Sequence, residues 1–282
     1  MRTPGSVVSV GEVHNSASDA VSLYTAPGPF ADPEALPLGE ADGQSGFKVL
    51  AEYFGGFASL SNAELELLRE LTTTSHYHPP HRNLWVAGAP PPPPRMLIAG
   101  WACRYRSLSN GRRQIVNFIL PGDFIGPVLQ PRLPSLCSVA AITEIETVSA
   151  KPLADVAAAA HSDYPNLAFA THLTAHLQDT LLCEQVARLG QQNASERFAN
   201  LMLELCDRLG RRGLTHGNQF SMPLTQDVLA DALGLSVVHL NRTVQQLRRD
   251  GLLKLRGGII TLLQLDRLQA LASWSPSRLP AR

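Results

Sequence analysis

The chain has 282 residues, enough for about two domains, and 44% hydrophobic against 17% charged residues is typical of a globular protein that buries real cores. The net charge is zero, but from Ala194 onward there are 12 Lys and Arg against 7 Asp and Glu, a local charge of +5 that favours contact with phosphate groups. No run reaches the roughly 18 apolar residues of a membrane span and no hydrophobic targeting segment follows Met1, so we expect a cytoplasmic protein without membrane contact.

The N-terminal part predicts an extension followed by a folded domain. Residues 1–45 are rich in Gly, Pro, Ser and Ala without periodicity, which predicts a disordered extension. We place the first domain at 46–162. It should open with a helix from Phe47 to about Phe54. A capping box at Ser61–Glu64 predicts a second helix, with Leu65, Leu68 and Leu71 on its buried side.

Strand-like runs occupy roughly residues 75 to 150. Ile115–Leu120 and Ile142–Val148 are the most β-prone of them, and Ser109–Gly111 and Pro121–Asp123 have the composition of turns. The five consecutive prolines at 90–94 have no backbone donors, so they predict a stiff loop and exclude a ladder-forming strand. An antiparallel β domain follows from this pattern.

Three histidines beside this proline-rich stretch are candidate metal ligands. His76 and His78 would share one face of a strand, and His81 could fold back toward them. Exposed histidines need no metal, however, and no acidic residue or cysteine adjoins these three. We therefore predict no cofactor, and keep a metal- or haem-binding sensor as the alternative.

A long helix is expected at 163–190. Its apolar residues fall close to heptad spacing, which is typical of a helix that pairs with a second copy. They are Leu167, Ala170, Leu173, Leu177 and Leu181. A single amphipathic helix packed on its own domain would show the same stripe. Gly190–Gln192 would form a hinge to the last domain, at 191–276.

In the last domain, the sequence predicts two short helices joined by a glycine turn. Asn193–Glu196 is a capping box for a supporting helix. Thr225 is a candidate N-cap of the first short helix, Gly234 suits the left-handed turn, and Ser236 caps the second helix. In that second helix the inward positions are apolar: Val237, Leu240, Val244 and Leu247.

The outward side of the second helix has the chemistry of base recognition. Arg pairs with guanine, Asn and Gln pair with adenine, and Val packs on a thymine methyl group. Two apolar runs around Gly257 and Gly258 predict a β-hairpin wing, whose cations would lie beside phosphates. The candidate DNA-binding residues are Thr225, Gln226, Ser236, Val238, His239, Asn241, Arg242, Gln245, Gln246, Lys254 and Arg256. An ordinary amphipathic helical hairpin is the competing interpretation.

Several motifs in order resemble the Crp/Fnr superfamily of bacterial transcription regulators. In the N-terminal half they are Gly100–Tyr105, Asn110–Ile115 and Leu120–Gly126; in the C-terminal half, Ser195–Leu209, Pro223–Leu235, Val238–Arg242 and Gly251–Leu253. The resemblance covers roughly residues 47 to 272. It implies an α+β fold: an N-terminal cyclic-nucleotide-binding-like β-roll (a jelly roll), a long dimerisation helix and a C-terminal winged helix-turn-helix.

The resemblance also implies a function. A homodimer would read a palindromic site in double-stranded DNA through a recognition helix at 236–249, with RNA polymerase as a candidate partner. No nucleophile elbow, phosphate loop or His-Glu-x-x-His motif is present, so the sequence does not predict an enzyme.

Two departures from the family pattern concern the effector. Nucleotide-binding members have Gly-Glu-Leu and then Arg-Ser, whereas here Gly126 precedes Pro127, and only Arg132 and Ser135 follow, out of register. We therefore predict that the effector is not cyclic AMP.

The four cysteines are scattered singly and none precedes Cys103, which excludes the N-terminal iron-sulfur cluster of the oxygen-sensing branch. The remaining cysteines are Cys137, Cys183 and Cys206.

Overall fold

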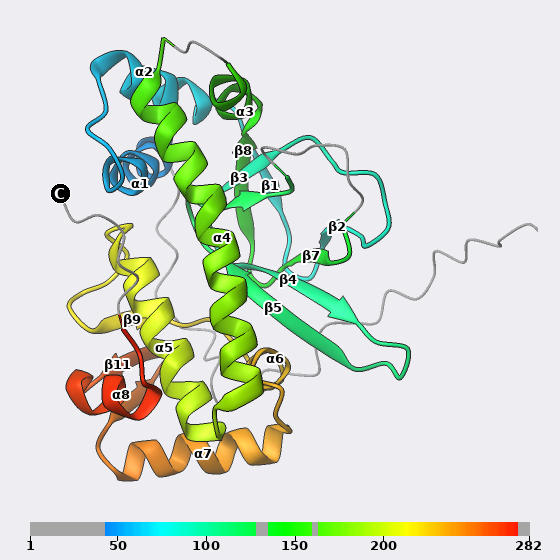
Figure 1. The fold of residues 1–282 in the computed structure, drawn as a ribbon, viewed down its shortest axis with the longest axis vertical. Coiled ribbons are helices and arrows are strands. Elements are labelled where there is room, and N and C mark those ends of the chain that lie inside the picture. The colour runs from blue at the N-terminus through cyan, green and yellow to red at the C-terminus, as the bar shows by residue number, and fades with distance from the viewer. Residues whose placement is uncertain (1–42, 128–134, 160–162, 276–282) are drawn as a thin grey trace, which may run out of the picture.

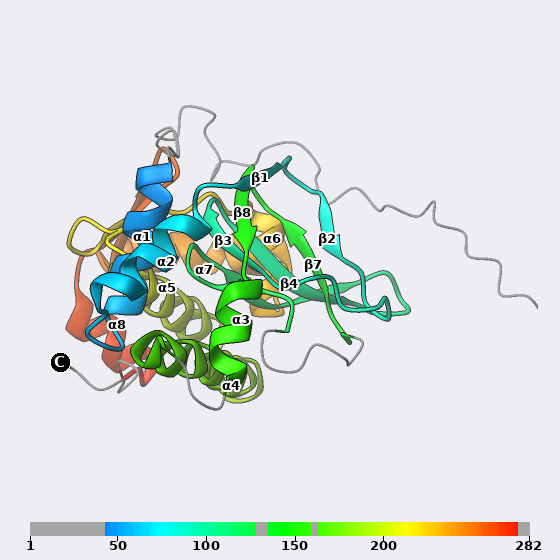
Figure 2. The ribbon, with the colours of Figure 1, turned by 90° about the horizontal axis from the view of Figure 1, so that it is seen from above.

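A computed structural model describes residues 43–127, 135–159 and 163–275 (Figure 1). The long helix α4, Pro165–Gln191, runs lengthwise through the molecule, with a β-roll on one side and a helical domain beside its lower half. From above, α4 lies across one side of the roll rather than inside it (Figure 2). This helix therefore contacts both domains.

The roll consists of two four-stranded antiparallel sheets. The first has the order β1 (Ser75–His78), β8 (Ile145–Ser149), β3 (Arg95–Ala99), β6 (Phe124–Ile125). The second has the order β2 (Asn83–Trp85), β7 (Ser138–Ala141), β4 (Ala102–Ser107), β5 (Arg113–Ile119). Apolar side chains from both sheets fill the space between them: Trp85, Leu97, Ala102, Ile119, Ile125, Val139, Ala141 and Ile145. The β-roll expected from the sequence is confirmed.

Three helices flank the roll. They are α1 (Gly43–Gly55), α2 (Asn62–Leu71) and α3 (Lys151–Ala158). The capping box predicted at Ser61 is present, and its Glu64 carboxylate also accepts a 2.8 Å hydrogen bond from the Leu167 amide. The start of α4 is thereby fixed to α2. Helix α1 begins before residue 46, so residues 43–45 are helical rather than part of the predicted extension; the rest of that extension lies outside the described residues.

The predicted strand run Ile142–Val148 is shorter in the structure. Thr143 Oγ1 accepts from the Trp101 amide at 3.0 Å, which bends the chain, and β8 begins only at Ile145. The prolines at 90–94 belong to no strand, as predicted. Most of the stretch that carries the cyclic-AMP prediction, 128–134, lies outside the described residues.

The apolar stripe of α4 packs largely on its own protomer. Leu167 and Ala170 are fully buried against the helices of the roll, and Leu173, Leu177 and Leu181 are half-buried. The interpretation of the whole stripe as a seam between two copies is therefore wrong for its first two residues. They were placed on the seam because helical spacing does not reveal which neighbour a stripe meets.

The C-terminal domain has the predicted winged-helix elements and two more. Its helices are α5 (Ala194–Gly210), α6 (Gln226–Leu233), α7 (Val237–Arg249) and α8 (Leu265–Ala272). Its sheet has the order β10 (Leu253–Arg256), β11 (Ile259–Leu262), β9 (Gln219–Ser221). The sequence did not predict β9 and α8, which are too short to show a clear period. One apolar cluster joins this domain to the roll, with Phe118 and Trp101 on one side and Phe198 and Leu229 on the other.

The histidine cluster does not assemble a metal site within the described residues. His76 and His78 lie on β1 as expected, but no group of three His, Cys, Asp or Glu side chains could hold an ion there. His78 Nε2 instead lies 3.2 Å from the Thr147 hydroxyl.

Among the described helices, none has the length and apolar character needed to cross a membrane.

Candidate nucleic-acid interface

The helix-turn-helix forms through the local signals present in the sequence. The Thr225 hydroxyl accepts from the Val228 amide at 3.3 Å, and the Ser236 hydroxyl accepts from the His239 amide at 3.2 Å. Between the two helices Gly234 has φ 63°, a left-handed conformation that favours glycine. Two side-chain caps therefore define the starts of α6 and α7, and one glycine forms the turn between them.

One face of α7 is closed by the domain core. Leu240, Val244 and Leu247 are buried as predicted, and Val237 packs half-buried against them. Thr243 is also buried, and its hydroxyl donates to the His239 carbonyl at 3.0 Å. The opposite face remains available for contact.

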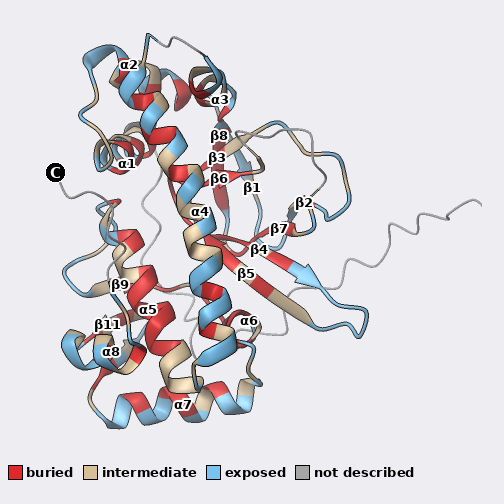
Figure 3. Cartoon of the chain, viewed as in Figure 1, coloured by how far each residue is buried: buried red, intermediate tan, exposed pale blue. Residues whose placement is uncertain are grey.

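The exposed face of α7 contains most of the predicted base-reading residues (Figure 3). Val238 has 60% of its surface exposed, unusual for a valine. The other exposed members are Ser236, His239, Arg242, Gln245 and Gln246. Arg242 has no hydrogen bond or ion pair with the part of the chain that the structure describes, so its guanidinium is free to bind. Gln246 is already engaged, because it bonds to both Arg249 and Asp250.

Three predicted site residues are less accessible. Thr225 is buried, and its hydroxyl oxygen serves the N-cap. Gln226 is buried and accepts a 2.6 Å hydrogen bond from the half-buried Asn241 amide. The structure thus joins the first turn of α6 to α7 through these two amides.

The wing places two cations beside α7. Lys254 and Arg256 lie exposed on β10, opposite Thr261 and Ile259 of β11. The connecting residues Gly257 and Gly258 have φ of 56° and 70°, as a tight hairpin requires. Such side chains bind phosphate without reading sequence.

The C-terminal end of α6 is held by side chains from three other elements. Its last carbonyls lack helical partners and need donors. Gln114 of β5 donates to the Asp231 carbonyl at 2.8 Å, Gln185 of α4 donates to the Ala232 carbonyl at 2.8 Å, and Arg197 of α5 donates to the Leu233 carbonyl at 2.9 Å. Arg113 of β5 also pairs with the Asp231 carboxylate at 2.6 Å. The roll and α4 therefore fix the orientation of the helix-turn-helix.

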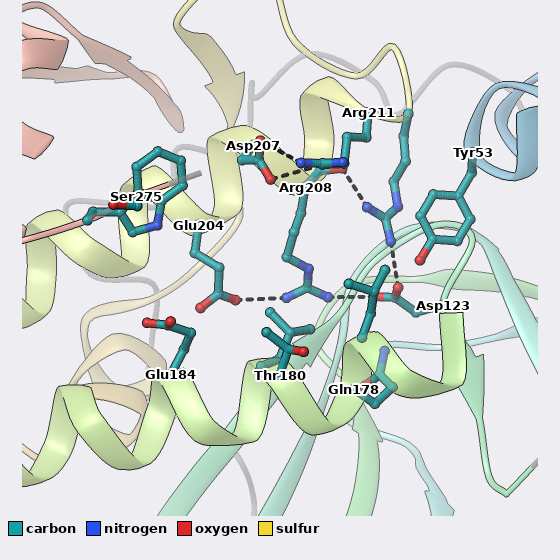
Figure 4. Close-up of a pocket in the computed structure, with 14 residues that line it drawn as sticks. Tyr53, Asp123, Gln178, Thr180, Glu184, Glu204, Asp207, Arg208, Arg211 and Ser275 are labelled. Atoms are coloured by element: carbon teal, nitrogen blue, oxygen red, sulfur yellow. Dashed lines mark hydrogen bonds and ion pairs between the residues drawn. The ribbon is translucent and has the colours of Figure 1, made fainter. Parts of the chain in front are cut away.

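A buried ion network connects the two domains (Figure 4). Arg208 of α5 lies between Glu204, at 3.0 Å, and Asp123 at the start of β6, at 2.6 Å. Arg212 contacts the second Asp123 oxygen at 2.5 Å, and Arg188 of α4 pairs with Glu204. Burial raises the pKa of Asp123, but the attraction of Arg212 and Arg208 outweighs it, so this pKa lies below its ordinary value. The carboxylate remains ionised and links roll to winged helix.

The sequence did not reveal these linking residues. Arg188 interrupts the apolar stripe of α4, and a buried cation there is a signal that a carboxylate faces it. Its partner Glu204 lies on another helix, and Asp123 lies much earlier in the sequence, in the roll. No short-range pattern relates these positions.

Comparison with known proteins agrees with the architecture. Residues 196–271 match the model of the Crp-like helix-turn-helix domain. The transcriptional activatory protein AadR of Rhodopseudomonas palustris is 31% identical over 179 residues, covering 63% of this chain and 72% of that protein. The nitrogen fixation regulation protein FixK of Bradyrhizobium diazoefficiens is 28% identical over 224 residues, covering 79% and 84%.

Solved structures show the same fold. That of FixK2 from Bradyrhizobium japonicum superposes with a TM-score of 0.59 at 24% identity, over 72% of this chain and 98% of that one. A transcriptional regulator of the CRP family from Thermus thermophilus gives 0.54 at 18% identity, over 72% and 98%. The relatives are regulators and not enzymes. With its β-roll, long helix and exposed recognition helix, the chain belongs to the Crp/Fnr family of DNA-binding transcription regulators.

Proposed function

We propose that this regulator reads a palindromic DNA site as a homodimer, each copy inserting the recognition helix 236–249 into the major groove. The observation that carries the proposal is the face of α7, where Arg242 is exposed and unpaired among the described residues and Val238 is 60% exposed. Exposing an apolar side chain to water is unfavourable. Packing of Val238 against a thymine methyl group would remove that apolar surface from water.

The side chains divide by role. Arg242 would donate to a guanine and Val238 would pack on a thymine methyl group, while the amides of Asn241, Gln245 and Gln246 suit adenine. The exposed candidates Ser236, His239, Lys254 and Arg256 suit phosphate contacts, because they present hydroxyl, imidazole or cationic groups around α7. Thr225 and Gln226 are buried, so they would contribute through the cap of α6 and the bond to Asn241 rather than by direct phosphate contact.

The dimer would form through the free face of α4. Ala175 and Leu182 are one heptad apart and half-buried, and Val186, one turn further, is 72% exposed. These residues lie on one face, apart from the side that packs on the protomer's own domains. Parallel pairing along this face would place the two recognition helices at the same end of the dimer.

We further propose that residues 46–162 form the sensor domain, 163–190 the dimerisation helix and 191–276 the DNA-binding domain. The effector would not be cyclic AMP, because no Arg-Ser pair follows Gly126 in the family's register. RNA polymerase remains a proposed partner, and chromosomal DNA as the target implies a cytoplasmic location.

Selection of DNA from a random pool by the full-length protein tests the proposal. We expect a palindrome with two half-sites about one helical turn apart, and sedimentation should give two chains for each selected duplex. Asymmetric sites bound by one chain would contradict the dimer, and an absence of sequence enrichment would contradict the reading role of α7.

A further inference from the structure

Arg104 occupies an unusual position for an arginine, on the inner face of the roll. It pairs across β4 with Asn117 of β5 on one side and Val139 of β7 on the other. Residues directly opposite in an antiparallel pair present their side chains to the same face. Val139 and Ala102, two residues before Arg104, both belong to the apolar interior. The Arg104 side chain therefore points toward the interior of the roll.

No group among the described residues pairs with this guanidinium. Arg104 is only partly exposed and has neither a hydrogen bond nor an ion pair there. Burial lowers the pKa of Arg104, while the Asp123 carboxylate attracts its charge and Arg208 repels it. Burying a cation without a partner costs free energy, because the cation loses its hydration. An anion bound beside Arg104 would offset part of that cost.

The surrounding charges leave Arg104 uncompensated. Both oxygens of Asp123 are taken, one by Arg212 and the other by Arg208 together with the Leu120 amide. Glu204 is similarly shared between Arg188 and Arg208. Among the described residues of this cluster, the guanidinium groups of Arg104, Arg188, Arg208 and Arg212 therefore face two carboxylates, Asp123 and Glu204. Glu184, which lines the adjoining pocket between α4 and α5, is exposed to water.

A second unsatisfied group lies directly across the ladder. Asn117 is 7% exposed, and its Oδ1 is buried with no hydrogen-bond donor among the residues that the structure describes. Its Nδ2 donates to Gln178 Oε1 of α4 at 2.9 Å. An unpaired buried amide oxygen is destabilising, because it has lost its hydrogen bonds to water without replacement. The inner face thus combines a cation that lacks an anion with an acceptor that lacks a donor.

We propose that Arg104 and Asn117 form a binding site for a small anion that also carries a hydroxyl group, as a hydroxycarboxylate or phosphate does. The anionic oxygens would accept from Arg104, and the hydroxyl would donate to Asn117 Oδ1. The site differs from the family's phosphate-binding Arg-Ser, which follows Gly126, because it is built on β4 and β5. It extends the proposed function, since Asn117 is bonded to α4, the helix whose Gln185 holds α6.

The test measures anion binding by the full-length protein without DNA, so its outcome is independent of the proposed reading of DNA. Melting temperatures and calorimetry in an anion-poor buffer compare inorganic phosphate, glycolate and acetate. We expect a saturable rise in melting temperature with phosphate or glycolate, and the more effective of the two identifies the ligand class. Acetate lacks the hydroxyl and should bind at least about tenfold more weakly, the loss of one good hydrogen bond.

Two arginine variants locate the site. Arg104→Leu should abolish the rise, whereas Arg106→Leu, an exposed residue of the same strand, should retain it. No saturable rise with either anion, or an equal rise in Arg104→Leu, would overturn the proposal.

Milder variants keep the test decisive should Arg104→Leu fail to fold. Arg104→Lys retains the charge but loses bidentate donation, so binding should weaken by about tenfold. Asn117→Ala should reduce glycolate binding to the level of acetate. Unchanged affinity in both variants would likewise overturn the proposal.

Discussion

At the scale of single residues, Asp123 has the largest structural role. It accepts from Arg208 of α5, from Arg212 just beyond the end of that helix, and from the Leu120 amide, and its own surface is 3% exposed. Three donors compensate the cost of burying the Asp123 carboxylate. Without that carboxylate, Arg208 and Arg212 would be buried cations that have lost their shared counter-charge. This side chain therefore contributes to the stability of the contact between roll and winged helix, together with the shared apolar cluster.

Replacing Asp123 by Asn should lower the free energy of unfolding by about 3–5 kcal/mol, because it leaves Arg208 and Arg212 as buried cations without a counter-charge. Urea denaturation followed by fluorescence measures the loss. Asp207→Asn is the matched control: Asp207 pairs with Arg211 at 3.0 Å but its side chain is 24% exposed. The control should lose only about 0–1 kcal/mol. Similar losses in the two variants would contradict this account of the network.

At the scale of elements, α4 combines three contacts on different faces. Its first turns pack on the helices of the roll, and Gln185 and Arg188 contact the winged helix. On a further face, Leu182 is half-buried and Val186 is 72% exposed. A helix with contacts on so many sides shows no single clear stripe. This explains why the sequence pattern indicated a helix but not its partners.

Leu182→Glu should dissociate the proposed dimer, because pairing would bring two carboxylates together at one heptad position. Sedimentation equilibrium of the purified protein measures the shift toward monomer. Phe169→Glu is the control, since Phe169 is 52% exposed but lies on another face of the same helix. Dissociation by Phe169→Glu alone would place the seam on that face instead.

The wing should contribute affinity but little specificity. Changing Lys254 or Arg256 to Ala should weaken binding to all sequences alike and reduce the slope of log K against log salt by about one unit, because each variant neutralises one phosphate fewer. Fluorescence anisotropy over a salt series checks this. Lys151→Ala, on an exposed residue of α3 paired with Asp155, should leave the slope unchanged. A changed base preference in either wing variant would show that the wing reads sequence.

Elements with local signals could be predicted from the sequence. The caps at Ser61, Asn193, Thr225 and Ser236 and the turn at Gly234 each depend on residues within four positions, and all are present. The exposed face of α7 was predictable for the same reason. The pair Arg113 with Asp231 was not, because 118 positions separate the two residues and neither has a distinctive neighbour.

At the scale of the whole molecule, the two domains form one connected structure. A shared apolar cluster and the Asp123–Arg208–Glu204–Arg188 network join them, while β5 and α4 fix α6. Packed side chains therefore run without interruption from the roll to the helix-turn-helix. The orientation of α7 is a property of the whole protomer.

Acid should weaken this connection. The attraction of arginines outweighs burial for both Asp123 and Glu204, and it holds both pKa values below the ordinary 3.8 and 4.5. Groups with a lowered folded pKa contribute stability above their unfolded pKa and lose it as pH falls through the folded value. The free energy of unfolding should thus be steady above about pH 5 and fall below about pH 4. Asp123→Asn should show a shallower fall, and an equal slope in both proteins would contradict the linkage.

Arg242 is the residue proposed to read guanine from the major groove. DNA selected from a random pool by the wild-type protein, by Arg242→Ala and by Arg248→Ala tests this most directly, since Arg248 is exposed on the same helix but at its far end. Arg242→Ala should lose about 1–3 kcal/mol per half-site and the guanine preference at one position, whereas Arg248→Ala should keep that preference. If Arg242→Ala selects the same guanine as the wild type, Arg242 does not read it and the placement of α7 in the groove is wrong.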